Sequence, residues 1–161
     1  MSYIKKNFLL TNKTAEELYF GYAKDMPIFD YHCHLPEKQI LENKPFSDVF
    51  EIWLAGDHYK WRLMRNYGVN ERFITGDASN KEKFVTYCTV LGTAFGNPLY
   101  HWSQVELEEF FGCTTEINAE NAEAIWDECN AYILKNGITP TGCPSEEGHP
   151  VFRCSALRTR K

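Results

Sequence analysis

The sequence predicts an α/β protein made of one strand followed by several helices. An apolar run at 26–29 leads into the sequence DYHCHL at 30–35 and breaks at Leu35-Pro36. This places polar side chains at the carboxyl end of a strand, where α/β barrels carry their chemistry. Helix start signals follow in the rest of the chain. Because a single strand with two unpaired edges needs neighbours, we interpret the chain as the opening of a larger sheet.

The strand, expected at 28–33, carries a candidate metal site. Successive side chains of a strand alternate between faces, so His32 and His34 point the same way. Neutral imidazole is a favoured ligand for zinc and similar divalent metals, and a catalytic metal needs about three protein ligands. At least one further ligand must therefore come from elsewhere. Asp30 lies on the same face and either orients an imidazole or belongs to the core. The alternative is a half-exposed strand that carries two histidines without any metal.

Capping patterns place the first helices. Thr14 and Glu17 have the spacing of a capping box and predict a helix over 15–24, with an apolar side formed by Leu18, Tyr19 and Tyr22. Further along, Ser47 and Asp48 open a helix that is interrupted at Gly56, and Asp57 caps another that ends near Gly68.

Three more helices follow in the second half of the chain. Ser79 with Glu82 forms a capping box, and Asn97-Pro98 is a cap followed by proline in the first turn. The helix after Pro98 is expected to present Trp102, Val105 and Phe110 as its apolar positions. The last helix is expected to start at Asn118 as its cap and to end at Gly137.

Composition narrows the function classes. The 161 residues are 43% hydrophobic and carry a net charge of −5, which suits one core and gives no basic face for nucleic acid or anionic membranes. No stretch approaches the roughly 20 apolar residues of a membrane span, and the start lacks a long apolar signal core, so we expect a cytoplasmic protein. The 6 cysteines are scattered, without a CxxC pair, and are interpreted as reduced thiols.

A second constellation is the sequence GDHYKWR at 56–62, which gathers several chemically active side chains at a helix start. His58 and Tyr59 are the pair of interest, since a phenol needs a neighbouring metal or cation to act as a base near neutral pH. The alternative is a polar helix face with a core tryptophan. His101, in an aromatic helix start, and His149 are weaker candidates for ligands.

Five motifs in order resemble the uronate isomerase family, also called glucuronate isomerase. They are DYHCHL at 30–35, IWLAGDHYKWR at 52–62, ITGDA at 74–78, NPLYHW at 97–102 and IWDECN at 125–130. The resemblance covers roughly residues 7–136. It implies that the chain is the N-terminal part of a (β/α)8 TIM barrel of the amidohydrolase superfamily, in which the first strand supplies the paired histidine ligands.

The resemblance also implies a function in hexuronate metabolism. The family interconverts D-glucuronate with D-fructuronate and D-galacturonate with D-tagaturonate. Carried over to this chain, His32 and His34 would hold a divalent metal, expected to be zinc, and His58 with Tyr59 would face the open-chain sugar. A proton would leave C2 and return at C1 through an enediol, with Tyr59 as the hypothetical proton shuttle. The expected partner is a small hexuronate; the oligomeric state stays open.

The chain departs from the family pattern in two ways. A barrel needs at least about 250 residues, and the later acidic ligand and the arginines that would clamp the uronate carboxylate are absent. The segment 137–161 loses the pattern, whereas residues 1–136 keep it. Arg153 to Thr159, back-translated and read two nucleotides later, permits Val-Phe-Cys-Thr-Thr-Asp-Glu, so we interpret the tail as an out-of-frame translation of the next barrel segment.

Three functions stay open at this point. The first is uronate isomerase, with the short chain itself expected to be inactive. The second is a metal-dependent hydrolase of the same superfamily, because the paired histidines are shared with it. The third is a non-catalytic helical binding module built from the aromatic helices, and exposed apolar faces lead us to expect aggregation of the isolated chain.

Overall fold

A computed structural model describes residues 5–26 and 35–142. The described elements are helical, apart from one isolated antiparallel bridge between Thr139 and Gly142. The predicted strand at 28–33 lies outside the described residues. In order, the elements are α1 (Lys13–Leu18), a π-helical turn η1 (Tyr19–Ala23), α2 (Glu37–Glu42), α3 (Val49–Trp53), α4 (His58–Asn66), a 3₁₀ turn η2 (Glu71–Phe73), α5 (Asn80–Leu91), α6 (Pro98–Phe111) and α7 (Ala122–Asn136).

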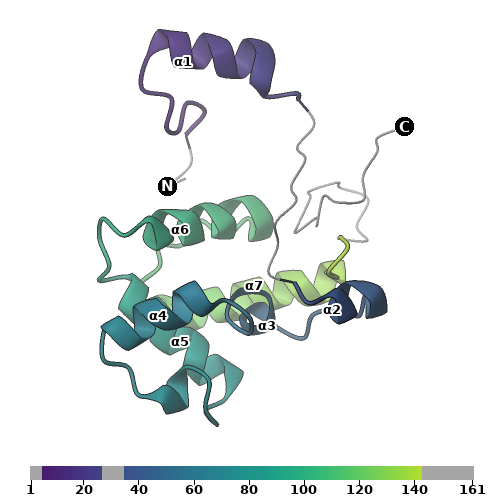
Figure 1. The fold of residues 1–161 in the computed structure, drawn as a ribbon, viewed down its shortest axis with the longest axis vertical. Helices are drawn as coiled ribbons and strands as arrows, with labels where there is room; N and C mark the ends of the chain where they lie inside the picture. Colours follow the sequence, from purple (N-terminus) through teal and green to yellow (C-terminus); the bar gives the residue numbers. More distant parts are fainter. Residues whose placement is uncertain (1–4, 27–34, 143–161) are drawn as a thin grey trace.

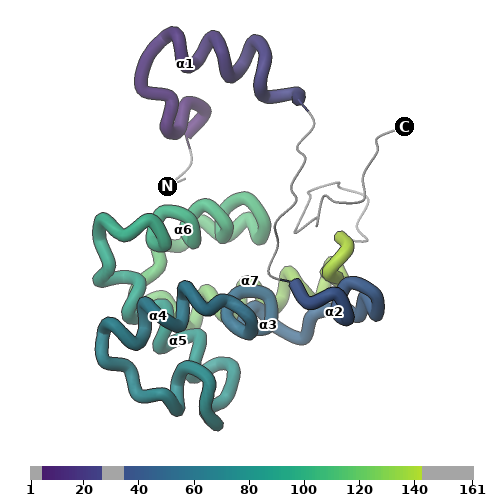
Figure 2. The backbone as a smooth tube through the Cα atoms, in the orientation of Figure 1, coloured from purple at the N-terminus to yellow at the C-terminus, as the bar shows by residue number. Residues whose placement is uncertain are grey.

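Helix α5 is the centre of the helical body. It packs against α7, α3 and α4, while α6 packs against α7. Figures 1 and 2 show these helices together and α1 apart from them. The aromatic centre of the core is Trp53 of α3, whose ring lies 6.0 Å from that of Phe84, 6.4 Å from that of Tyr87 and 6.3 Å from that of Phe111. Because aromatic pairs at these separations add to simple burial, this cluster ties α3, α5 and α6 together.

Most predicted helix starts are confirmed. The Asp48 side chain accepts from the Glu51 amide at 2.9 Å, and the Ser79–Glu82 capping box is complete. Asn97 accepts from the Leu99 amide at 3.0 Å ahead of Pro98. At the far end, Gly137 closes α7 in the left-handed region, with φ 56°, as its glycine predicted.

Two predicted starts are wrong. The first helix is capped by Asn12, which accepts from the Ala15 amide at 2.9 Å, so α1 begins two residues before the predicted position. The last helix begins at Ala122 and not after Asn118, because the Asn118 side chain closes a turn onto the Asn121 amide at 2.9 Å. In the first case Asn12 takes the capping position predicted for Thr14, and in the second the Asn118 oxygen closes a turn and does not cap the helix.

The predicted apolar positions of α6 are correct only in part, since Phe110 is half-buried and packs against the core but Trp102 does not. Trp102 is 59% exposed, whereas Tyr100, Gln104, Leu107 and Phe111 are buried. Gln104 is tolerated there because its amide donates to the Thr115 carbonyl and its oxygen accepts from the Ile117 amide, both at 3.1 Å. Hydrophobic periodicity counts glutamine as a polar, exposed position, so it could not indicate that Gln104 is buried.

The cysteines within the described part agree with reduced thiols. Cys88, Cys113 and Cys129 are free and buried, and burial raises the pKa of the Cys88 thiol. Cys33, Cys143 and Cys154 lie outside the described residues. Among the described helices, none is long and apolar enough to cross a membrane.

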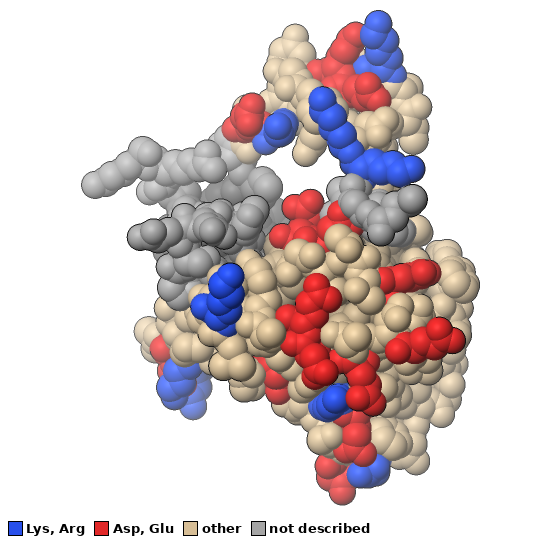
Figure 3. Space-filling model, turned by 180° about the vertical axis from the view of Figure 1, so that it is seen from behind, with Lys and Arg blue, Asp and Glu red and all other residues tan. Residues whose placement is uncertain are grey.

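One face of the molecule is mainly acidic. Figure 3 shows acidic side chains gathered on the face that lies behind the view of Figure 1, with few basic ones between them. This agrees with the net charge of −5 and makes that face unfavourable for a polyanion.

Candidate active site

The first turn of α4 is fixed by Asp57. Its Oδ1 accepts from the Tyr59 amide at 2.9 Å and from the Lys60 amide at 3.2 Å, as the capping pattern predicted. A second bond links the two helices: the Trp61 indole Nε1 of α4 donates to the carbonyl of Leu54, at the end of α3, at 2.6 Å. Because these bonds satisfy groups at a helix start, the backbone that carries His58 and Tyr59 is well defined.

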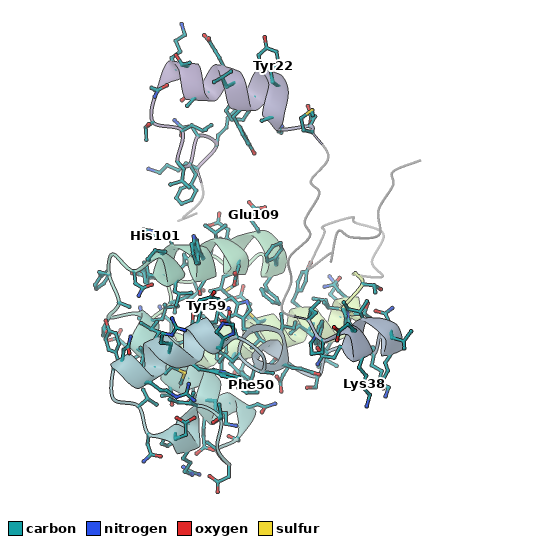
Figure 4. All side chains as sticks on the ribbon, in the orientation of Figure 1. Tyr22, Lys38, Phe50, Tyr59, His101 and Glu109 are labelled. Atoms are coloured by element: carbon teal, nitrogen blue, oxygen red, sulfur yellow. The ribbon has the colours of Figure 1, made fainter. Side chains whose placement is uncertain are left out.

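His58 and Tyr59 lie side by side on the surface of α4. Their ring centroids are 4.4 Å apart with 32° between the planes, and the Arg62 guanidinium lies over the Tyr59 ring at 5.6 Å. Both side chains are exposed, Tyr59 to 51%. Figure 4 shows Tyr59 on the side of α4 nearer to α6. The arrangement brings an imidazole and a phenol together beside a cation.

Lys60 is buried below this pair, which sequence reasoning missed. Its side chain is only 7% exposed, and its Nζ lies 3.7 Å from Asp57 Oδ2 and 3.6 Å from Glu106 Oε2. The same nitrogen lies 5.0 Å from the centre of the Trp53 ring. An ammonium held among two carboxylates and an indole face has charge compensation that allows burial.

Glu106 of α6 is the second functional candidate that the sequence did not reveal. Burial raises the pKa of its carboxyl above the ordinary value, opposed by the Lys60 ammonium and reinforced by the Asp57 carboxylate. Its Oε2 and the Trp53 Nε1 are covered and make no hydrogen bond within the described residues. The only sequence signal for this buried cluster was the i, i+3 spacing of Asp57 and Lys60. That spacing gives no hint of Glu106 and is also common on solvated helix faces.

The predicted metal ligands cannot be placed. His32, His34 and Asp30 lie outside the described residues, as does the weaker candidate His149. Within the described part of the chain, no group of three or more His, Cys, Asp or Glu side chains could hold a metal ion. His101 is exposed on α6, with the Tyr100 ring 5.9 Å away, edge to face, and so lies in aromatic surroundings as its neighbours suggested.

The family model that matches the chain is glucuronate isomerase, over residues 1–146. Two similar curated proteins are both named uronate isomerase. The chain is 51% identical over 138 residues to that of Clostridium acetobutylicum and 55% identical over 141 residues to that of Mannheimia succiniciproducens. These alignments cover 86% and 87% of the chain but only 29% and 30% of the relatives, so the chain spans less than a third of their length.

Solved structures agree with the sequence comparison. The uronate isomerase of Thermotoga maritima superposes with a TM-score of 0.79 at 41% identity, covering 88% of this chain and 31% of its own. The glucuronate isomerase of Caulobacter crescentus superposes with a TM-score of 0.66 at 26% identity, covering 75% of this chain and 27% of its own. Family model, relatives and structures coincide, and the chain belongs to the glucuronate isomerase family.

Proposed function

We propose that this chain supplies the amino-terminal segment of a uronate isomerase barrel of the amidohydrolase type. In this proposal the complete enzyme interconverts D-glucuronate with D-fructuronate and D-galacturonate with D-tagaturonate in the cytoplasm. The observation that carries it is the exposed His58–Tyr59 pair at the start of α4, 4.4 Å apart, in a chain of this family. A pair fixed by its backbone and open to solvent suits contact with a small polar substrate.

The reaction requires one proton to move between neighbouring carbons. A base removes the proton from C2 of the open-chain aldose, and the electron pair of that bond forms the enediol while O1 gains a proton. The hydroxyl at C2 then gives up its proton, its oxygen becomes the ketone, and C1 receives a proton. We assign the C2 and C1 proton transfers to the oxygen of Tyr59, whose ring lies under the Arg62 guanidinium, and assign orientation of the sugar to His58.

A divalent metal, zinc in our proposal, belongs to the same site. Two imidazoles separated by one residue are the donor type that zinc takes, so His32 and His34 fit this role by their chemistry. When bound, such a metal polarises a carbonyl or hydroxyl oxygen of the sugar and stabilises negative charge on it. The remaining ligands would come from parts of the barrel beyond this chain.

The test is to complete the barrel. Residues 1–136 are joined to the carboxy-terminal remainder of the Thermotoga maritima enzyme, and ketose formation from both uronates is followed in the presence of zinc. We expect turnover of at least one uronate, together with about one zinc ion per chain that is lost in a His32→Ala, His34→Ala variant. The 161-residue chain alone is expected to give none, because it lacks the ligands of a closed site. A zinc-loaded, folded fusion that converts neither uronate would contradict the proposal.

A further inference from the structure

We propose that Lys60 and Glu106 form a buried clamp between α4 and α6 and act as positioning residues for Tyr59 and His58. The assignment of a catalytic consequence rests on the proposed function. The clamp itself rests on geometry alone, so the two can be tested separately.

The Lys60 ammonium joins three elements at one point. It faces Asp57 Oδ2 at the start of its own helix, Glu106 Oε2 on α6 at 3.6 Å, and the Trp53 ring at the end of α3. Asp57 uses its other oxygen to hold the Tyr59 and Lys60 amides. A continuous chain of polar contacts therefore runs from α6 through Lys60 and Asp57 to the backbone of Tyr59.

The clamp is a poor device for stability. Burying an ammonium and a carboxylate costs free energy, and replacing such a pair by apolar side chains of similar volume is often neutral or stabilising. Here the compensation is incomplete, since the buried Glu106 Oε2 and Trp53 Nε1 lack hydrogen-bond partners within the described residues. A charged contact has a preferred geometry, which an apolar contact lacks. Because the ammonium lies between oxygens that are fixed in position, it restricts the rotation of α4 about its axis.

Rotation of α4 matters for the residue next to Lys60. Tyr59 is about half exposed, at 51%, so the backbone of the first turn contributes much of its placement. A misplacement of about 1 Å at a reacting group can lower the rate about a hundredfold. Loosening the clamp should therefore lower kcat while leaving the binding of the sugar nearly unchanged.

The experiment compares two substitutions of one residue. Glu106→Gln keeps an oxygen that can accept from Lys60, whereas Glu106→Leu keeps the volume and removes the contact. Glu109→Leu on the same helix is the matched control, because Glu109 is exposed and points away from α4 (Figure 4). The double variant Lys60→Met, Glu106→Leu removes both charges and is expected to fold even if the single leucine variant does not.

Two readouts are used. In the 161-residue chain, amide hydrogen exchange at Tyr59 and Lys60 is expected to be about fivefold faster in Glu106→Leu and in the double variant than in Glu106→Gln, with α5 amides unchanged. In the fused isomerase, the leucine and double variants are expected to lose about tenfold in kcat with KM within about twofold. The glutamine and Glu109→Leu variants are expected to stay near wild type.

Each outcome decides something. Equal exchange and equal kcat in the glutamine and leucine variants, or recovery of both readouts in the double variant, would overturn the clamp. An exchange difference in the 161-residue chain, together with a folded fusion that has no isomerase activity, would leave the clamp standing and remove the proposed function. An exchange difference with full kcat would confine Lys60 and Glu106 to a structural role.

Discussion

Asp57 serves two partners at once, and substitution can separate them. In Asp57→Ala the Tyr59 and Lys60 amides lose their acceptor, which costs about 1 kcal/mol for a typical helix cap. Lys60 also loses one of its two carboxylate neighbours, and a contact to a buried charge adds about 1–2 kcal/mol. The expected loss of unfolding free energy is therefore about 2–3 kcal/mol. Asp57→Asn keeps an acceptor oxygen for the amides and loses only the charge beside Lys60, so it should lose about 1–2 kcal/mol.

The assay is urea unfolding of the 161-residue chain followed by far-ultraviolet circular dichroism. Asp127→Asn is the control, because it removes an exposed carboxylate on α7 and should change the unfolding free energy by less than about 0.5 kcal/mol. Equal losses in the alanine and asparagine variants would assign the whole effect to the charge and refute the role of Asp57 as a cap. No loss in the alanine variant would refute both contacts.

Two further predictions concern packing and pH. Gly92→Ala should destabilise the fold by about 1–3 kcal/mol and lower the thermal midpoint, because the added Cβ would lie 2.8 Å from the Asn118 Cα. Gly21→Ala is the control: nothing lies within 4 Å of its added Cβ, so it should not lower the thermal midpoint. A hydrogen bond from Arg65 is the main cause that lowers the pKa of Glu71 from 4.5 to about 2. Since the folded state holds this carboxylate below its ordinary pKa, its stabilising effect is complete above pH 4.5 and is lost as the pH falls towards 2. Thermal midpoints measured between pH 6 and pH 2.5, about half a unit above that pKa, should therefore fall more steeply for wild type than for Glu71→Gln; parallel curves would contradict this.

Local signals in the sequence were sufficient for most of the helices. Asp48, Asp57, Ser79 and Asn97 each have a side-chain oxygen at the right distance from the amides that follow, so the cap and the helix come from one short segment. Asn118 shows the limit of this reasoning, since an asparagine can close a turn as readily as it caps a helix.

Burial of polar side chains could not be predicted in the same way. Lys60 is buried because the Glu106 carboxylate of α6 lies beside its ammonium, and Gln104 is buried because the loop after α6 satisfies its amide. Both sets of partners are known only once α4, α6 and that loop are packed. The adjacency of His58 and Tyr59 could be predicted because both belong to one short motif, and their roles stay a prediction. His32 and His34 stay a prediction, since they lie outside the described residues.

The central claim is that Tyr59 takes part in uronate isomerisation, and one measurement tests it most directly. Turnover of D-glucuronate by the fused enzyme is compared for wild type, Tyr59→Phe and Tyr67→Phe; Tyr67, at 49% exposed, lies at the other end of α4 and serves as the control. We predict that Tyr59→Phe lowers kcat by about a hundredfold or more with a similar thermal midpoint, whereas Tyr67→Phe leaves turnover unchanged. Turnover of Tyr59→Phe near the wild-type value would contradict the account.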